Sequence, residues 1–184
     1  MIEIVFVGRG GQGAVTASQI AATAAFQEGK FAQAFPSFGP ERRGAPVTAY
    51  ARVDDKPIVF RHPVDQADYL IVLDPNIFKV ADPFVWLKAG GTAVLNLDRP
   101  APGGGQGARA VRVDASAISE QIYGPRPIPI TNVAMLGALA AVADFVELEN
   151  ILDVIDRFFP AAEADRAKTS ARLAHQQLEG AESP

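Results

Sequence analysis

Short apolar runs alternate along the chain with longer segments in which apolar residues recur three and four positions apart. A short run of β-branched and other apolar residues predicts a buried strand, and the longer spacing predicts a helix with one apolar face. The strands expected from this pattern are residues 2–7, 31–35, 45–53, 57–60, 67–73, 92–97 and 108–113. The helices expected are residues 13–27, 84–88, 115–123, 132–145, 148–159 and 163–179.

The order of these elements indicates the fold class. Strands that alternate with helices after a fully apolar first strand are typical of an α/β domain with a mainly parallel sheet. Residues 45–53 alternate apolar and polar side chains, and residues 57–60 follow a short polar turn, so the two segments predict an added β-hairpin. We therefore expect one domain over residues 1–184, with C-terminal helices and with roughly the last 20 residues forming a peripheral helix and tail.

Composition excludes several kinds of site. The 184 residues include no cysteine and two histidines, which lie far apart at His62 and His175. Thiolate-held iron–sulfur clusters, cysteine zinc sites and thiol nucleophiles are therefore excluded from this chain, and we expect no metal site. A net charge of −4 argues against nucleic acid. No apolar stretch is long enough to cross a membrane and no targeting segment is recognisable, so we expect a cytoplasmic protein.

The first expected strand leads into GRGGQG at residues 8–13, where Gly8, Gly10 and Gly13 fit the G-x-G-x-x-G fingerprint of Rossmann-like dinucleotide-binding domains. Such a turn places the N–H groups of a helix N-terminus beside a ligand. A dinucleotide site also uses an acidic residue at the end of the second strand, and residues 34–38 contain none. Three alternatives stay open: an NAD or FAD site, a purely structural turn, and use of the turn within a larger assembly.

The connection at residues 35–46 reads FPSFGPERRGAP. A solvated loop does not need the aromatic ring of Phe38, and a core segment does not tolerate Glu41, Arg42 and Arg43 without partners. One interpretation is a rigid proline-rich turn with an internal Glu–Arg pair. The other is a pre-ordered loop whose Arg and Phe side chains contact another subunit or a phosphate-bearing ligand.

Four motifs together resemble a known family: the glycine turn, this loop, DYLIVLDP at 68–75 and NVAMLGALA at 132–140. Over residues 1–160 the chain is similar to the gamma subunit of the 2-oxoacid:ferredoxin oxidoreductases, which also occurs as a fused domain in single-chain pyruvate:ferredoxin oxidoreductase. Arg9 and the form of the loop are most similar to the pyruvate type. Subunits for branched-chain or aryl 2-oxoacids such as phenylglyoxylate share this form.

The resemblance implies a division of labour within a complex of anaerobic metabolism. The complex would decarboxylate a 2-oxoacid oxidatively, transfer the acyl group to coenzyme A and reduce ferredoxin or another acceptor. Thiamine diphosphate and magnesium would lie between the alpha and beta subunits, and iron–sulfur clusters in the beta or the ferredoxin-like delta subunit. The chain itself would carry no cofactor, would be inactive alone, and would help to form the coenzyme A side of the assembly.

The resemblance also implies two groups of site residues, with no catalytic residue among them. The cofactor side comprises Gly8, Arg9, Gly10, Gly11, Gln12, Gly13 and Asn132, and the interface or coenzyme A loop comprises Phe38, Glu41, Arg42 and Arg43. Arg9 and Gln12 are expected to point out of the turn, and Asp74 to cap the following helical turn or to line the cleft. Two rivals stay open: a free-standing NAD- or FAD-binding oxidoreductase, and a structural domain that forms a homodimer when isolated.

Overall fold

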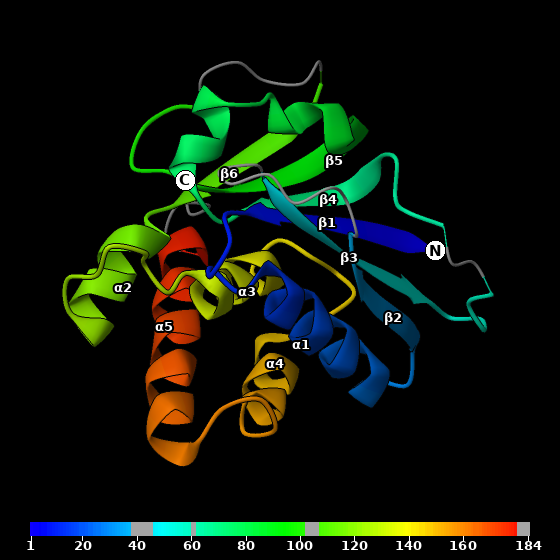
Figure 1. The fold of residues 1–184 in the computed structure, drawn as a ribbon. Coiled ribbons are helices and arrows are strands. Elements are labelled where there is room, and N and C mark those ends of the chain that lie inside the picture. The colour runs from blue at the N-terminus through cyan, green and yellow to red at the C-terminus, as the bar shows by residue number, and fades with distance from the viewer. Residues whose placement is uncertain (38–45, 60–61, 102–106, 180–184) are drawn as a thin grey trace.

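The protein is built on a six-stranded sheet with the strand order β2-β3-β1-β4-β5-β6. The computed structural model describes residues 1–37, 46–59, 62–101 and 107–179. The strands are β1 (Ile2–Gly8), β2 (Phe31–Pro36), β3 (Val47–Asp54), β4 (Ala67–Val72), β5 (Leu87–Asn96) and β6 (Arg109–Val113). Figure 1 shows the α-helices gathered below this sheet.

Five α-helices and two short 3₁₀ helices are present in the described part of the chain. They are α1 (Ala14–Gln27), η1 (Pro75–Lys79), η2 (Pro83–Trp86), α2 (Ala115–Tyr123), α3 (Asn132–Ala140), α4 (Leu148–Ile155) and α5 (Ala161–Glu179). Most expected elements are confirmed within a few residues. The helix expected at 132–145 is shorter, because α3 ends at Ala140 and a connection follows.

Three of the five neighbouring strand pairs are parallel, namely β1–β4, β4–β5 and β5–β6, while β3 is antiparallel to β1 and to β2. The predicted single Rossmann-like α/β domain with a mainly parallel sheet is therefore confirmed. From β1 the chain builds β2 and β3 on one side and β4 to β6 on the other. This reversal makes a topological switch point at the carboxyl ends of β1 and β4, the usual place for a ligand in such sheets.

The expected hairpin between residues 45–53 and 57–60 is wrong in its second strand. Residues 57–59, which the structure describes, form no strand, and β3 instead pairs with β1 and β2. The segment after β3 crosses the face of the sheet, where the Gln33 side-chain amide donates to the Ile58 carbonyl at 2.9 Å. Alternating side chains had identified the strand correctly, but they carry no information about which neighbour it pairs with.

The helix expected at 84–88 is also corrected. Only η2 is helical there, and β5 already begins at Leu87, so Lys88 lies in a strand. Gly90 and Gly91 lie within β5. A Cβ on Gly91 would lie 2.9 Å from the Asp68 carbonyl oxygen, so this glycine allows two strand backbones to approach.

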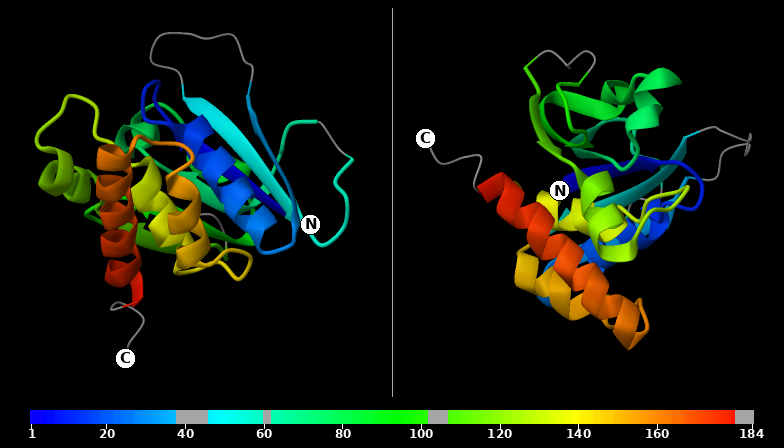
Figure 2. Two further views of the ribbon diagram at one scale, coloured as in Figure 1. Left: turned by 90° about the horizontal axis from the view of Figure 1, so that it is seen from below. Right: turned by 90° about the vertical axis from the view of Figure 1, so that its left-hand side faces the viewer.

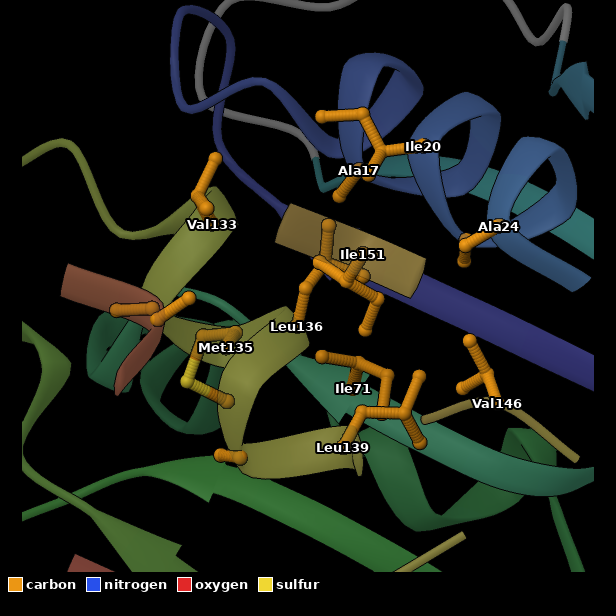
Figure 3. Packing of buried hydrophobic residues seen from close by; sticks show 14 of the residues in the cluster. Ala17, Ile20, Ala24, Ile71, Val133, Met135, Leu136, Leu139, Val146 and Ile151 are labelled. Atoms are coloured by element: carbon orange, nitrogen blue, oxygen red, sulfur yellow. The ribbon is translucent and has the colours of Figure 1, made fainter. Parts of the chain in front are cut away.

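The main core lies between the sheet and the α-helices. Small residues on α1, such as Ala17 and Ala24, bring this helix close to the strands, and Leu136, Leu139 and Ile71 fill the space beside it (Figure 3). The opposite face of the sheet is covered by a smaller apolar cluster that includes residues of η1 and η2. The α-helices thus cover one face of the sheet, and the candidate site lies at its carboxyl edge.

The last helix is an integral part of this core, which corrects its expected peripheral place. Figure 2 shows α5 running beside α3, and the two helices are in extensive contact. The buried side of α5 consists mainly of alanines, including Ala167, Ala171 and Ala174. Alanine on one helix and Gly137 on the other allow the two backbones to pack directly.

Candidate functional site

The ends of four strands lie together at the carboxyl edge of the sheet. Gly8 at the end of β1 lies opposite Val47, and Pro36 at the end of β2 lies opposite Ala49, so β1 and β2 end on the same edge. The parallel strands β4 and β5 end there too. The carboxyl ends of β1, β2, β4 and β5 therefore lie together at this edge.

The turn after β1 is closed by one of its own side chains. The Arg9 backbone N–H donates to Gln12 Oε1 at 2.7 Å, and the Gln12 backbone N–H donates to the Arg9 carbonyl at 3.1 Å. Gln12 is only 3% exposed, so the expectation that it points out of the turn is wrong. Gly11 and Gly13 have φ angles of +88° and +75°, a conformation that favours glycine. The motif therefore specifies a tight turn that Gln12 stabilises from within.

Asp74, at the start of η1, joins this turn to the neighbouring strand. Its carboxylate accepts from Gln12 Nε2 at 2.7 Å and from Arg9 Nε, and it also accepts from the backbone N–H of Asn76 at 2.7 Å. The interpretation of Asp74 as a cap is thus confirmed, because its side chain caps η1. The carboxylate is only 1% exposed and lies below the surface of the edge, so it does not line an open cleft. The Arg9 side chain remains 39% exposed although it is bound to Asp74.

The environment of Asp74 favours its ionised form. Burial by itself would raise the pKa of this carboxyl group, but the hydrogen bonds from Asn76 and Arg9 and the positive charge of Arg9 outweigh it, so the pKa lies below its usual value. A carboxyl group whose pKa is lowered on folding stabilises the fold above its unfolded pKa, and this contribution is lost as the pH falls through the folded pKa.

We expect Asp74→Asn to lower the free energy of unfolding by about 2 kcal/mol at neutral pH, because charge-assisted hydrogen bonds of a buried carboxylate are lost. The difference from the unchanged protein should begin to shrink below about pH 4, where Asp74 takes up a proton in the unfolded chain, and should shrink further as the pH falls through the lower pKa of the folded carboxyl group. Urea unfolding at several pH values measures both effects. Asp65→Asn, at an exposed aspartate, is the matched control. An Asp74 effect that stayed constant down to pH 2 would contradict this account.

Asn132 is brought to the same turn from α3. A Cβ on Gly13 would lie only 2.5 Å from Asn132 Nδ2, so the side chain packs directly on the third glycine of the motif. Asn132 Oδ1 is buried and has no hydrogen-bond partner. Thr131 holds the N-cap position of α3, but its hydroxyl donates to the Leu73 carbonyl at 3.2 Å rather than capping the helix. The structure therefore brings the glycine turn and Asn132, which the resemblance placed in one group, into contact.

This arrangement disfavours a dinucleotide. Asp74 places a buried negative charge at the switch point, where a pyrophosphate would lie in a nucleotide-binding domain. Strand β2 ends in Phe35 and Pro36 and is followed by Ser37, without the acidic residue that would hold a ribose. Phe38, Glu41, Arg42 and Arg43 lie outside the described residues.

The sequence had not indicated a cavity of ≈ 720 Å³ at the same edge, between η1 and α2. Its polar lining includes Lys79, Asn96, Ser116 and Arg126. Asn96 is 2% exposed and donates to the Leu73 carbonyl at 2.8 Å, so its amide helps to fix the ends of β4 and β5. Asn96 follows apolar strand residues, as Asp74 does, and this position was the signal that could have identified it as a residue of the edge.

Two further features were searched for within the described ranges. No group of three or more His, Cys, Asp or Glu side chains there could hold a metal ion. In that same part of the chain, no helix has the length and apolar character needed to cross a bilayer.

Comparison with known proteins identifies a family and several similar proteins. Residues 3–177 match the family model described as pyruvate ferredoxin/flavodoxin oxidoreductase. The chain is 44% identical to pyruvate synthase subunit PorC of Methanothermobacter thermautotrophicus, over 97% of both chains. It is also 44% identical to the pyruvate/ketoisovalerate oxidoreductases common subunit gamma of Thermococcus kodakarensis, over 95% of both. The crystal structure of pyruvate oxidoreductase subunit PORC from Thermotoga maritima superposes with a TM-score of 0.77 at 32% identity, over 95% of both chains.

Proposed function

The chain belongs to the pyruvate ferredoxin/flavodoxin oxidoreductase family, and from this premise we propose that it is the gamma subunit of a 2-oxoacid:ferredoxin oxidoreductase complex of the pyruvate type. The observation that carries the proposal is the 44% identity to a pyruvate synthase subunit over nearly the whole of both chains. The complex would oxidise and decarboxylate the 2-oxoacid, form the acyl thioester of coenzyme A, and pass two electrons to ferredoxin.

In this proposal the chain is a non-catalytic subunit. Thiamine diphosphate, magnesium and the iron–sulfur clusters would be held by alpha, beta and delta subunits. A sequence without cysteine supports this division, because cluster irons in proteins are held mainly by cysteine thiolates. The contribution of the chain would be to shape the assembly and to present the carboxyl edge of its sheet to the coenzyme A side.

The chemistry of the glycine turn suggests what it contacts. Asp74 already pairs with Arg9, so the two side chains together offer no net positive charge to a phosphate at the turn. The buried Asn132 Oδ1 needs a hydrogen-bond donor rather than an anion. Gly10 adds no side chain, and no heavy atom lies within 4 Å of where its Cβ would stand. These features fit an uncharged chain with amide N–H groups, such as the pantetheine arm of coenzyme A or the backbone of a partner subunit.

One observation bears on which 2-oxoacid the complex oxidises, and it favours a gamma subunit that serves more than one substrate. A relative with the same 44% identity is named as a gamma subunit common to pyruvate and ketoisovalerate oxidoreductases. We therefore propose that this chain does not select the 2-oxoacid. A branched-chain or aryl substrate would then depend on the alpha and beta subunits with which the chain assembles.

The proposal is tested by isolating the chain from its native cells under anaerobic conditions and identifying the polypeptides bound to it by mass spectrometry. We expect alpha, beta and delta subunits in the complex, and acyl-CoA formation with acceptor reduction when pyruvate and coenzyme A are added. In a reconstituted complex, Arg42→Ala/Arg43→Ala should raise the KM for coenzyme A or weaken assembly. A chain that bound NADH alone at micromolar concentration and lacked these partners would contradict the proposal.

A further inference from the structure

The two edges of the sheet differ in a way that the proposed function does not explain. Strand β6 forms one edge and carries Arg109 and Arg112, and charged side chains of this kind are a usual protection of an edge strand against pairing. Strand β2 forms the other edge with the sequence FAQAFP, which contains no charge. Lys30, just before it, is already paired with Asp55 at 3.3 Å. Edge β2 thus lacks the side chains that would prevent it from accepting another strand.

The hydrogen-bond pattern shows which residues of β2 face outward. The Ser37 N–H donates to the Thr48 carbonyl at 3.0 Å, so Ser37 and Thr48 form a hydrogen-bonded pair of the β2–β3 ladder. Because such pairs alternate along antiparallel strands, Phe35, Gln33 and Phe31 also direct their backbone groups toward β3. Ala32, Ala34 and Pro36 therefore direct theirs away from the sheet. Pro36, which has no N–H, stands at an outward position, where proline is tolerated in an edge strand.

An apolar groove runs along the same edge. Its volume is ≈ 460 Å³, and it is lined in part by Ala32, Ala34, Phe26 and Phe158. Phe26 is 65% exposed and Phe31 is 43% exposed, which are large values for aromatic side chains. In Figure 1, β2 is the outermost strand on this side, next to α1. A strand added to β2 would cover these rings as well as the outward backbone groups.

We propose that two copies of this chain associate through antiparallel pairing of their β2 strands about Gln33, which extends the sheet across both molecules. In this register Ala32 of each copy lies opposite Ala34 of the other, and their outward N–H and C=O groups form four hydrogen bonds. Phe31 of each copy lies opposite Phe35 of the other, which covers the exposed ring. This association does not depend on the proposed function.

A second copy suits this edge because the edge is self-complementary. A two-fold axis through Gln33 places each outward N–H of Ala32 and Ala34 opposite an outward C=O of the second copy. The strand contains no charged residue, so the pairing brings no like charges together. The two grooves become continuous across the axis, so their alanine and phenylalanine surfaces are covered together. A charged segment of another protein would instead leave its charge beside an apolar groove, at a cost in desolvation.

Cysteine cross-linking tests the register directly, because the chain has no cysteine of its own. Gln33 would face Gln33 of the second copy in a non-hydrogen-bonded pair, with Cα atoms about 4.5 Å apart, within the range of a disulfide. We expect Gln33→Cys in the full chain to form a covalent dimer under mild oxidation, resolved by non-reducing gel electrophoresis. Ala32→Cys is the matched control, because its partner across the interface is Ala34 rather than itself.

Association without any cross-link is measured by sedimentation velocity on the full chain. Ala34→Pro removes an N–H that faces away from β3, so it should weaken dimerisation roughly tenfold or more. Its thermal unfolding should stay close to that of the unchanged protein. Gln33→Ser reports the effect of losing the hydrogen bond to Ile58 by itself. A chain that sediments as a monomer at every concentration, or Gln33→Cys that cross-links no faster than Ala32→Cys, would overturn the proposal.

Discussion

Gly137→Ala should destabilise the protein by about 3 kcal/mol, although glycine-to-alanine changes within helices usually stabilise. Gly137 lies in α3, and a Cβ at this position would stand 2.6 Å from the carbonyl carbon and 2.7 Å from the Cα of Ala171 in α5. These are backbone atoms, which cannot rotate away as a side chain can. The two helices would have to separate, and the alanine face of α5 would lose its packing. Urea unfolding at neutral pH measures the loss.

Gly10→Ala is the matched control for this substitution. Gly10 has no heavy atom within 4 Å of an added Cβ and no positive φ angle. The same chemical change should therefore alter the free energy of unfolding by less than about 0.5 kcal/mol. Equal effects at Gly137 and Gly10 would mean that the close contact between α3 and α5 does not decide the stability of this region.

The contact at Gly137 illustrates what the sequence could and could not predict about the fold. The apolar pattern predicted helices over residues 132–145 and 163–179, but the second of them was expected to be peripheral. Periodicity identifies which side of an element is buried, but not which element covers it. The same limit explains the hairpin, because the alternation at 45–53 identified β3 and could not show that it lies between β1 and β2.

In the candidate site, the structure formed by neighbouring residues could be predicted from the sequence, and the contacts between distant residues could not. Three glycines at the end of an apolar strand predicted the turn and the start of α1, since these depend on neighbouring residues. The resemblance implied that Gln12 points outward. Its Oε1 accepts from the nearby Arg9 N–H, but its Nε2 donates to Asp74, which lies 62 positions further along the chain. A polar side chain is buried where it finds a hydrogen-bond partner, and a partner far away in the sequence comes close only in the folded chain.

Arg52→Met should lower the free energy of unfolding by about 3 kcal/mol or more, which is typical of breaking a buried ion pair from one side. Arg52 is 0% exposed, and its Nε donates to Glu3 Oε1 at 3.0 Å. Its Nη2 donates to the His62 carbonyl at 2.7 Å, and its guanidinium lies 5.1 Å from the ring centre of Phe35. One side chain therefore connects β1, β2 and the segment after β3 on the face of the sheet opposite the α-helices.

Urea unfolding of Arg52→Met and of Lys88→Met compares the loss of a buried cation with the loss of a partly exposed one. Lys88 also pairs with Glu3, at 3.4 Å, but its side chain is 39% exposed, so its loss should cost less than about 1 kcal/mol. Arg52→Met/Glu3→Gln should recover part of the stability that Arg52→Met loses, because the carboxylate left without its buried partner is removed as well. If Arg52→Met cost no more than Lys88→Met, the connection after β3 would be held by its apolar contacts and not by Arg52.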